Sequence, residues 1–362
     1  MSLTHGASIR SSPLSNKKNR GEWSELYALL HILATGKIRS STRDGDDAFD
    51  FQVVSVALVI GGTNHTFQIS DSNIEILDNT SKTIIDFVTR GELLDQSKLL
   101  LANIKSGKGR SFPIPETASI MSALRIDKVA GSVEKTDLLL KIYDPRINRE
   151  TEQGFSIKSF LGGKPTLLNA AGTTNIDYTI MGNVSAIDLS MLNKLGPVEI
   201  VTSLYEMDCR LAPINMDSRF VENLKMIDSE MDILLAHIVL ASFQGKGRGM
   251  NDLLKILVKT NPLNYSPKNS EVRYTHKIKD LLEAVALGMR PSKPWAGLAE
   301  AKGGHLIVTS TGEVICHHAL DKDTLRNYLF DNLTIDTPSQ KRHKFGKISS
   351  GKISLNFQIR FR

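Results

Sequence analysis

The chain has 362 residues, of which 41% are hydrophobic and 23% are charged, as in an ordinary soluble globular protein. This length allows one large domain or two modest ones and is sufficient to bury a sizeable core. No apolar run is long enough to span a membrane, and the first residues lack the apolar stretch of a secretory signal. We therefore expect a cytoplasmic protein. Cys209 and Cys316 stand far apart without a neighbouring cysteine, which indicates reduced thiols and argues against a zinc site.

The formal net charge is +6, and the positive excess gathers near both ends of the sequence. Residues 1–20 carry four cationic side chains and no acid, and the segment KRHKFGKISSGKISLNFQIRFR carries seven and no acid. Clustered positive charge without compensation favours a polyanion such as nucleic acid as the partner. A solvated cationic face is the alternative. The aperiodic, Ser/Lys/Asn-rich residues 1–19 predict a flexible basic arm.

Hydrophobic periodicity predicts the elements up to residue 162. A helix is expected over 21–35, with Gly36 as its stop signal, because apolar side chains recur there at helical spacing. The next two runs, 50–60 and 64–70, alternate as strands of a hairpin joined through Gly-Gly-Thr. The expected elements that follow are a helix at about 92–105, the linker SGKGRSFPIPE, a helix at 116–125 and paired strands at 137–145 and 154–162.

The remaining residues predict a mainly helical region and then further strands. Residues 185–235 have helical character, and GKGRG (245–249) is a glycine-rich basic turn without Walker spacing. The later elements are expected to be a helix at 276–289, a hairpin at 305–320 turning at Thr-Gly, a short helix at 322–333 and strands at 343–349 and 353–361. The chain is thus predicted to have a mixed α/β or α+β fold with a largely antiparallel sheet.

The strand GFSIKSFLG places Lys158 among apolar residues, although a strand near a core usually keeps lysine at its ends. If the preceding turn is centred on residues 146–149, antiparallel pairing puts Asp137 opposite Lys158 on the same face. A one-residue slip would change both the partner and the face. Such an ion pair is either purely structural or held in a site that requires charge.

A carboxylate beside an ammonium group suits metal-assisted hydrolysis of a phosphodiester. Carboxylates hold Mg²⁺ next to the scissile phosphate, the ion lowers the pKa of the attacking water, and a lysine stabilises the extra negative charge. Because one carboxylate is a weak magnesium site, a second is expected. Glu22 and Glu25 lie three residues apart on one face of the first helix. Their alternative role is that of surface acids complementing the helix dipole.

Several segments resemble the HpaII-type type II restriction endonucleases, in the same order along the chain. They are NRGEWSELY (19–27), KTDLLLKIYDPR (135–146), GFSIKSFLGGKPTLLNAAGTTN (154–175) and TPSQKRHKFGKI with LNFQIRF (337–361). The resemblance implies an α/β (α+β) PD-(D/E)xK fold, with a central mixed sheet flanked by helices and additional helical and C-terminal β elements. It also implies a nuclease core over 20–183 and a DNA-binding region over 184–362.

The resemblance also implies roles for individual residues. Asp137 corresponds to the metal-binding aspartate and Lys158 to the lysine of the (D/E)xK element. Ser156 stands where that element has an acid, and serine is a poor Mg²⁺ ligand. A glutamate of the first helix is the natural replacement, and the resemblance favours Glu25 over Glu22. The less favoured substitutes are Glu152, Asp144 and Glu116.

Candidate DNA-binding side chains follow the lysine strand and recur later in the sequence. LGGKPTLLNAAGTTN combines glycines, which permit close approach, with side chains suited to phosphates and base edges. A loop capped by its own Asn and Thr side chains is the alternative. The candidates are Lys164, Asn169, Thr173, Thr174, Asn175, Arg248, Arg342 and Lys344.

The leading hypothesis is a Mg²⁺-dependent type II restriction endonuclease acting on double-stranded DNA at a short palindrome such as CCGG. A palindromic target requires a homodimer or a monomer that nicks each strand in turn, and a cognate methyltransferase is expected as a functional partner. Two alternatives are a structure-selective repair nuclease and a non-catalytic basic DNA-binding protein in which Ser156 marks a degenerate site. A cluster of Glu25, Asp137 and Lys158 would favour an enzyme, whereas helix glutamates in solvent would favour a binding protein.

Overall fold

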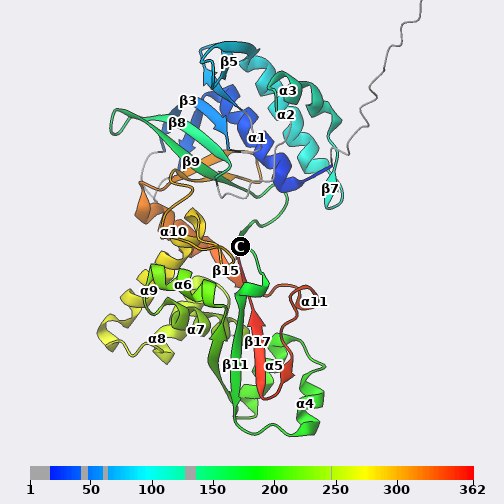
Figure 1. Ribbon diagram of the computed structural model, residues 1–362, viewed down its shortest axis with the longest axis vertical. Helices are drawn as coiled ribbons and strands as arrows, with labels where there is room; N and C mark the ends of the chain where they lie inside the picture. The colour runs from blue at the N-terminus through cyan, green and yellow to red at the C-terminus, as the bar shows by residue number, and fades with distance from the viewer. Residues whose placement is uncertain (1–16, 42–47, 60–63, 127–135, 246) are drawn as a thin grey trace, which may run out of the picture.

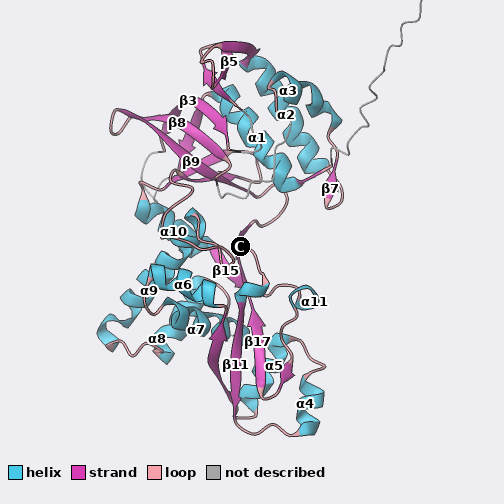
Figure 2. Cartoon of the chain, in the orientation of Figure 1, coloured by secondary structure: helices cyan, strands magenta, loops and turns pink. Residues whose placement is uncertain are grey.

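The computed structural model of the chain describes residues 17–41, 48–59, 64–126, 136–245 and 247–362. These residues form two units stacked along the long axis, each with its own cluster of buried apolar side chains (Figure 1). The first unit holds the N-terminal helices and a large sheet, and the second holds most of the other helices with smaller sheets (Figure 2). None of the helices in the described ranges is both long and apolar enough to cross a bilayer.

Helix α1 (Arg20–Thr35) is the central support of the first unit. Asn19 caps its N-terminus by accepting a hydrogen bond from the Glu22 N–H, and the Glu22 carboxylate accepts one from the Asn19 N–H. Gly36, with φ of 66°, ends the helix in the left-handed conformation. Ten of the helix's residues are buried. The helix predicted over 21–35 is therefore confirmed, and it lies inside the unit.

The first unit is built around a nine-stranded mixed sheet. Its strands are β2 (Lys37–Ser40), β3 (Asp50–Leu58), β4 (His65–Ile69), β5 (Asn73–Asp78), β6 (Ile84–Thr89), β8 (Leu138–Asp144), β9 (Arg149–Ser159), β13 (Gly304–Val308) and β14 (Val314–His318). They lie in the order β2-β14-β13-β9-β8-β3-β4-β5-β6, and β2 also pairs with β3. Only the β9–β13 and β14–β2 pairings are parallel. The predicted mixed, largely antiparallel sheet is confirmed.

Three helices and a short ribbon lie beside this sheet. Helices α2 (Arg90–Ser106) and α3 (Ala118–Ala123) pack near α1, all at the right of the unit in Figure 2. A two-residue strand, β1 (Lys18–Asn19), pairs with β7 (Ser111–Phe112), so the segment predicted to be a linker is attached to the start of α1. Most of the predicted basic arm, residues 1–16, lies outside the described residues.

The β8–β9 hairpin has a different register from the one predicted. Its turn begins at Pro145, one residue earlier than expected, which moves the pairing by two residues. Ser156, and not Lys158, therefore continues the ladder opposite Asp137, so the predicted register was wrong. The reason is that proline cannot donate to the ladder, whereas Asn148 tolerates the φ of 51° that the turn requires. A shift of two residues preserves the face, so Lys158 still lies on the side of Asp137.

The second unit combines helices with two small sheets. Its helices are α4 (Ala186–Leu192), α5 (Pro197–Glu206), α6 (Ser218–Ile227), α7 (Met231–Phe243), α8 (Met250–Thr260), α9 (Pro267–Leu287), α10 (Lys322–Asn332) and α11 (Gln340–His343). Its strands are β10 (Thr166–Leu168), β11 (Asn175–Met181), β12 (Arg210–Met216), β15 (Leu333–Asp336), β16 (Ile348–Ser349), β17 (Lys352–Asn356) and β18 (Gln358–Phe361). They form the sheets β12-β11-β17-β16 and β10-β18-β15.

The sequence prediction missed part of this second unit. Strand β12 lies within the region predicted to be mainly helical, and β10 and β11 were not predicted. Pro213 of β12 argues against a central strand, and β12 is an edge strand, where proline is tolerated. Of the strand predicted at 343–349 only β16 forms, because the preceding residues make α11, which ends at Lys344 with φ of 51°.

The sequence analysis placed one boundary between the two units, after residue 183. In the structure, each unit is instead built from more than one stretch of the sequence. Strands β10 and β11 belong to the second core, although they precede that boundary. The β13–β14 hairpin, although it follows the boundary, completes the sheet of the first unit between β9 and β2. The chain therefore passes between the units after β9, before β13 and after β14.

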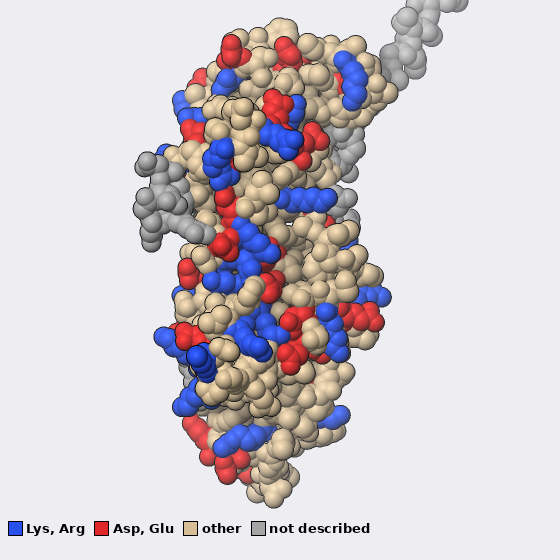
Figure 3. Space-filling model, turned by 90° about the vertical axis from the view of Figure 1, so that its left-hand side faces the viewer, with Lys and Arg blue, Asp and Glu red and all other residues tan. Residues whose placement is uncertain are grey.

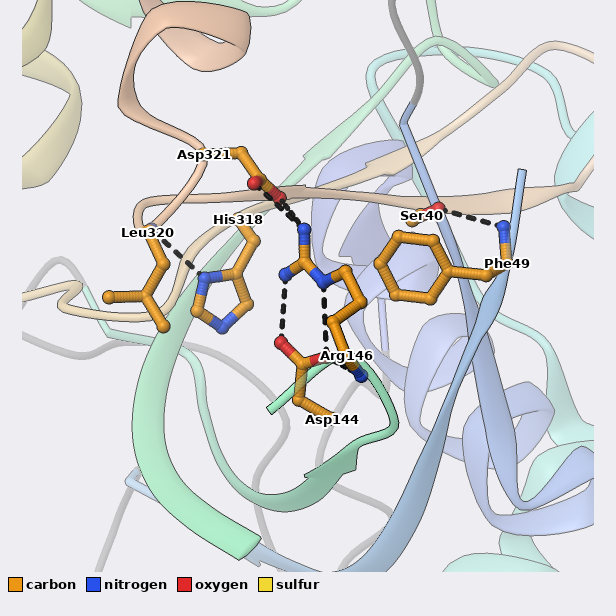
Figure 4. A network of polar contacts seen from close by, with 7 residues as sticks. All are labelled: Ser40, Phe49, Asp144, Arg146, His318, Leu320 and Asp321. Carbon is orange, nitrogen blue, oxygen red and sulfur yellow. Dashed lines mark hydrogen bonds and ion pairs between the residues drawn. The ribbon is translucent and has the colours of Figure 1, made fainter. Parts of the chain in front are cut away.

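Arg146 ties the turn of the β8–β9 hairpin to the segment that enters α10 (Figure 4). Its guanidinium donates to the Asp144 carboxylate at 2.8 and 3.0 Å and to the Asp321 carboxylate at 2.8 and 3.0 Å. The guanidinium also lies 4.6 Å from the ring centroid of Phe49. Burial favours the neutral form of Asp144, but the hydrogen bonds from Arg146 prevail and lower the pKa of this carboxyl.

We expect Arg146→Ala to lower the free energy of unfolding by about 3 kcal/mol at pH 7, because it leaves the buried Asp144 carboxylate without its cation. The lowered pKa of Asp144 means that its contribution is present near neutral pH and is lost as the pH falls through the folded-state pKa. The difference between wild type and variant should thus shrink from pH 7 towards pH 3. Urea unfolding at several pH values measures this.

Asp321→Ala is the matched control, because it removes the outer carboxylate and keeps the inner pair. It should cost about 1 kcal/mol or less, as expected of a partly exposed ion pair. Equal losses in the two variants would contradict the assigned importance of Asp144.

Candidate active site

Two serine hydroxyls join α1 to β9 at the centre of the first unit. Ser159 Oγ donates to Ser24 Oγ at 2.8 Å, and Ser24 Oγ donates to the Arg20 carbonyl oxygen at 2.6 Å. Ser24 is fully buried. Glu25 follows Ser24 on the helix, and Lys158 precedes Ser159 on the strand. Glu25 and Lys158, which come from distant parts of the sequence, interact electrostatically near this contact.

Backbone and hydroxyl groups orient the other members of the cluster. The Asp137 carboxylate, just before β8, accepts a hydrogen bond from the Ile157 N–H at 2.6 Å. The Lys158 ammonium group donates to Ser156 Oγ at 2.9 Å and to the Ile157 carbonyl oxygen at 3.2 Å. Ser156 is buried. It stands in the position where an acid was expected and holds the lysine instead.

Glu25, Asp137 and Lys158 form one electrostatic unit. The pKa of Glu25 rises from 4.5 to about 8, first because the group is buried and then because Asp137 is negative, while Lys158 opposes the shift. Burial lowers the pKa of Lys158, and the two carboxylates only partly offset this effect. When both carboxylates are ionised, the single lysine leaves an excess negative charge that a divalent cation would neutralise.

Glu25 and Lys158 line an open cleft of about 600 Å³. Its walls come from the N-terminus of α1, the loop before β7, the end of β9 and the segment leading into β10. Three of these segments belong to the first unit, and the fourth is the first connection to the second unit. The cleft thus lies where the two units are joined.

The oxygen donors at the cleft suit a magnesium ion. Glu25 and Asp137 offer carboxylate oxygens, and the Ile157 carbonyl oxygen lies beside them on β9. Over the described ranges, no three His, Cys, Asp or Glu side chains converge on one point. Mg²⁺ usually takes one or two protein carboxylates and completes its shell with water and substrate phosphates. A structural zinc ion would need four protein ligands, which this site does not offer.

Among the acids considered from the sequence, Glu25 is the one that the fold brings to the lysine and Asp137. The Glu22 carboxylate is engaged in capping α1. Asp144 belongs to the arginine network at the hairpin turn. Glu116 and Glu152 are exposed, and neither lines the cleft.

The predicted DNA-binding residues in the segment after β9 fall into two groups. Lys164 and Asn169 are exposed and line the cleft. Thr174 and Asn175 point instead into a buried network around Asn356, which donates to Asn175 Oδ1 at 2.6 Å and accepts from Thr174 Oγ1 at 3.0 Å. These two residues brace the loop rather than face a ligand.

Thr173 also lies outside the cleft lining. Its Oγ1 is buried and has no hydrogen-bond partner among the described residues. Thr173 therefore lies neither in the cleft nor in the hydrogen-bond network around Asn356.

The remaining predicted cations lie on the second unit, away from the cleft lining. Arg248 forms an ion pair of 3.6 Å with Asp336. Arg342 is exposed on α11, and Lys344 lines a separate hollow of about 540 Å³ beside it. In Figure 1, α11 and β7 lie on the same side of the molecule, so a long ligand in the cleft could extend towards both.

The sequence reasoning missed the residues that the loop before β7 contributes. Gly109 and Arg110 line the cleft from this loop, and Asn19 and Arg20 line it from the start of α1. The segment SGKGRSFPIPE was interpreted only as a linker. Its two cations separated by a glycine were the available signal, because a glycine-rich basic turn also suits phosphate contact.

One face of the molecule carries charges of both signs. Figure 3 shows a face on which Lys and Arg side chains are interspersed with Asp and Glu over both units. Mixed charge of this kind is typical of an ordinary solvated surface. That face therefore offers no extended positive surface for a polyanion.

Comparisons with known proteins support an assignment to one family. The model of the family described as HpaII restriction endonuclease matches residues 19–361. The chain is 34% identical, over 361 residues, to the type II restriction enzyme HpaII of Haemophilus parainfluenzae. The aligned region covers 95% of this chain and 98% of that enzyme. No solved structure matches the chain. The matched range includes every residue that lines the cleft.

The raised pKa of Glu25 predicts a pH-dependent loss of stability. Because the folded-state pKa of about 8 lies above the ordinary 4.5, the native state holds the proton more tightly, and stability falls as the pH rises between these values. We expect wild type to lose about 2 kcal/mol more than Glu25→Gln between pH 5.5 and 7.5, since one proton is worth about 1.4 kcal/mol per pH unit. Urea unfolding without metal ions measures this difference.

Glu22→Gln is the control on the same helix, and its free energy of unfolding should depend on pH as that of wild type does. If wild type and Glu25→Gln show the same dependence on pH, the prediction is wrong.

Proposed function

The chain belongs to the HpaII family of type II restriction endonucleases, and on this premise we propose that it hydrolyses duplex DNA at a short palindromic site with Mg²⁺ held by Glu25 and Asp137. As a restriction endonuclease it acts on double-stranded DNA. The observation that carries the proposal is the meeting of Glu25, Asp137 and Lys158 beside one open cleft.

Type II restriction enzymes generally use a divalent metal ion, and the donors of this cleft favour magnesium. Glu25 and Asp137 would hold the ion, with the Ile157 carbonyl oxygen as a further ligand. When bound, the ion neutralises the two carboxylates, lowers the pKa of a water molecule and polarises the scissile phosphate. The loss of the acid at position 156 is thus made good by a glutamate from α1.

The protein's own groups orient the reactants. The Ile157 N–H fixes one oxygen of Asp137 through a hydrogen bond. Ser156 and the Ile157 carbonyl oxygen hold the Lys158 ammonium group, so that its remaining donor capacity can be directed at a phosphate oxygen. Stabilisation of the charge that develops on that phosphate is the role we assign to Lys158. Lys164 and Asn169 would contact the bound DNA from the adjoining wall.

The target and the partners follow from the same proposal. We propose CCGG as the recognition sequence, because the family resemblance covers the loop and the C-terminal segments suited to base contacts. A palindrome offers the same bond on both strands, so cleavage requires a symmetric dimer or two successive nicks by a monomer. The enzyme would act in the cytoplasm, beside a methyltransferase that protects the same site in the host DNA.

The main alternative is a DNA-binding protein whose nuclease site has decayed. It rests on Ser156, which cannot replace an acidic metal ligand. Against it stands Glu25, which a decayed site would leave in solvent, but which here interacts electrostatically with both Asp137 and Lys158. The other alternative is a structure-selective repair nuclease that shares this core. Mapping the cut ends distinguishes it from a restriction endonuclease.

Digestion of a long, sequenced, unmethylated DNA with Mg²⁺ is the direct test. Wild type should produce discrete fragments whose ends map to one short palindrome. EDTA should abolish the fragments, and Lys158→Ala should slow cleavage on the order of 10³-fold, because a transition-state charge contact is lost. Intact DNA that still shifts in a binding gel would favour the decayed site, and ends at junctions or mismatches would favour a repair nuclease.

Substitution of single carboxylates tests which acids bind the metal. Glu25→Gln and Asp137→Asn should each reduce cleavage by at least about 10²-fold and shift its Mg²⁺ dependence to higher concentration, because one charged ligand is lost. Both should still bind DNA in EDTA, since neither adds negative charge to the site. Glu22→Gln should cleave nearly as wild type does. An active Glu25→Gln beside an inactive Glu22→Gln would reverse the assignment.

A further inference from the structure

We propose that the loop Gly107–Arg110 grips the DNA backbone, with Arg110 contacting a phosphate across the cleft from Lys164. The inference deepens the proposed function and rests on duplex DNA occupying the cleft. Arg110 would be a residue that positions the substrate, distinct from the metal-binding and charge-stabilising groups on α1 and β9.

The loop is fixed to the helix that carries Glu25. Strand β7, directly after the loop, pairs with β1, directly before α1. Trp23 Nε1 donates to the Phe112 carbonyl oxygen at 3.0 Å. The Phe112 ring leaves no room at Gly107, where an added Cβ would lie 2.3 Å from it. The start of the loop therefore packs directly on the residue that closes it.

Arg20 makes a second attachment from the first turn of α1. Its guanidinium donates to the carbonyl oxygens of Ile104 and Gly107 and lies 5.6 Å from the Phe112 ring centroid. The same side chain packs against the segment after β9, since a Cβ at Gly162 would lie 2.7 Å from Arg20 Cβ. One arginine thus holds both the loop and the opposite wall of the cleft at fixed positions relative to Glu25.

The tip of the loop offers positive charge without an acid to neutralise it. Lys108, Gly109 and Arg110 are exposed, and Gly109 and Arg110 line the cleft. Within the described ranges, no carboxylate lies within ion-pair distance of Lys108, Arg110 or Lys164. By contrast, the Arg146 guanidinium in Figure 4 is paired with two carboxylates. Free cations on two walls of one cleft indicate an anionic ligand that touches both walls.

The backbone at the tip also suits close contact with a phosphate. Gly109 has φ of 85° and open space where a Cβ would be, so the turn presents bare backbone between two cations. Arginine matches the geometry of a phosphate by donating two parallel hydrogen bonds. Phosphate contacts position a protein on DNA without reading its sequence. We therefore assign Arg110 to backbone binding and leave base recognition to other residues.

Salt-dependent binding tests the assignment. Binding of a CCGG duplex and of a same-length duplex without that site is measured in EDTA between 50 and 200 mM salt. For Arg110→Ala we expect roughly five- to tenfold weaker binding to both duplexes and a slope of log affinity against log salt that is smaller by about 0.9, as expected for one lost phosphate contact. Arg110→Lys should retain the wild-type slope, because the charge remains.

Lys255→Ala is the matched control, because Lys255 is an exposed cation on α8 that does not line the cleft. It should bind as wild type does. An equal loss of DNA affinity in Lys255→Ala would show that the effect comes from net charge. An unchanged affinity and salt dependence in Arg110→Ala would show that Arg110 does not contact a phosphate. Either result overturns the inference.

Duplexes with a single neutral methylphosphonate locate the contact. One position should weaken binding by wild type but not by Arg110→Ala, and if no position behaves in this way the inference is wrong. These binding measurements do not depend on cleavage. If wild type binds and cuts DNA but the Arg110 variant is unaffected, only this inference fails, whereas failure of wild type to cut under any condition refutes the proposed function instead.

Discussion

The packing of α1 against β9 is the constraint on which the rest of the site depends. The apolar side of the helix is buried in the first core, and the Ser24–Ser159 hydrogen bond sets its position along the strand. Glu25 follows Ser24 on the helix and Lys158 precedes Ser159 on the strand, and the two charged groups interact electrostatically. A polar contact inside an apolar interface permits fewer alignments than apolar packing alone. The carboxylate that we propose in place of the acid missing at position 156 comes from another element, α1.

This arrangement places charged groups in the interior, which lowers the stability of the fold. Burial, and after it repulsion from the negative Asp137, raises the pKa of Glu25 to about 8. The apo site is therefore less stable than an apolar packing would be, as is common where a site is organised for a ligand rather than for stability. A bound divalent cation would remove this repulsion, so metal binding and stability are expected to be linked.

Both units contribute walls to the cleft. The first unit carries the charged cluster, and its attached loop before β7 supplies one wall of the cleft. The segment from Gly162 to Asn169 forms another wall and leads into the second core, where the buried network around Asn356 braces the loop that follows. Because β13 and β14 return to complete the first sheet, the units are joined by three crossings instead of one hinge. A joint of this kind favours a cleft of fixed shape.

Local sequence was enough to predict most of the helices and the main hairpins, and it singled out Lys158 and Asp137 as candidates. Helical spacing, capping residues and period-2 alternation depend only on neighbouring residues, so α1, α10 and the β13–β14 hairpin could be recognised from the sequence. The edge strand β12 was missed because its proline is tolerated only at an edge, which is a property of the assembled sheet. Only the tertiary structure shows that Glu25 lies with Asp137 and Lys158 whereas Glu22 caps α1, because the two glutamates share a helix face in the sequence but differ in what packs against them. It also turned a presumed linker into a wall of the cleft and two presumed DNA contacts, Thr174 and Asn175, into internal braces, because the partners of these residues lie far away in the chain.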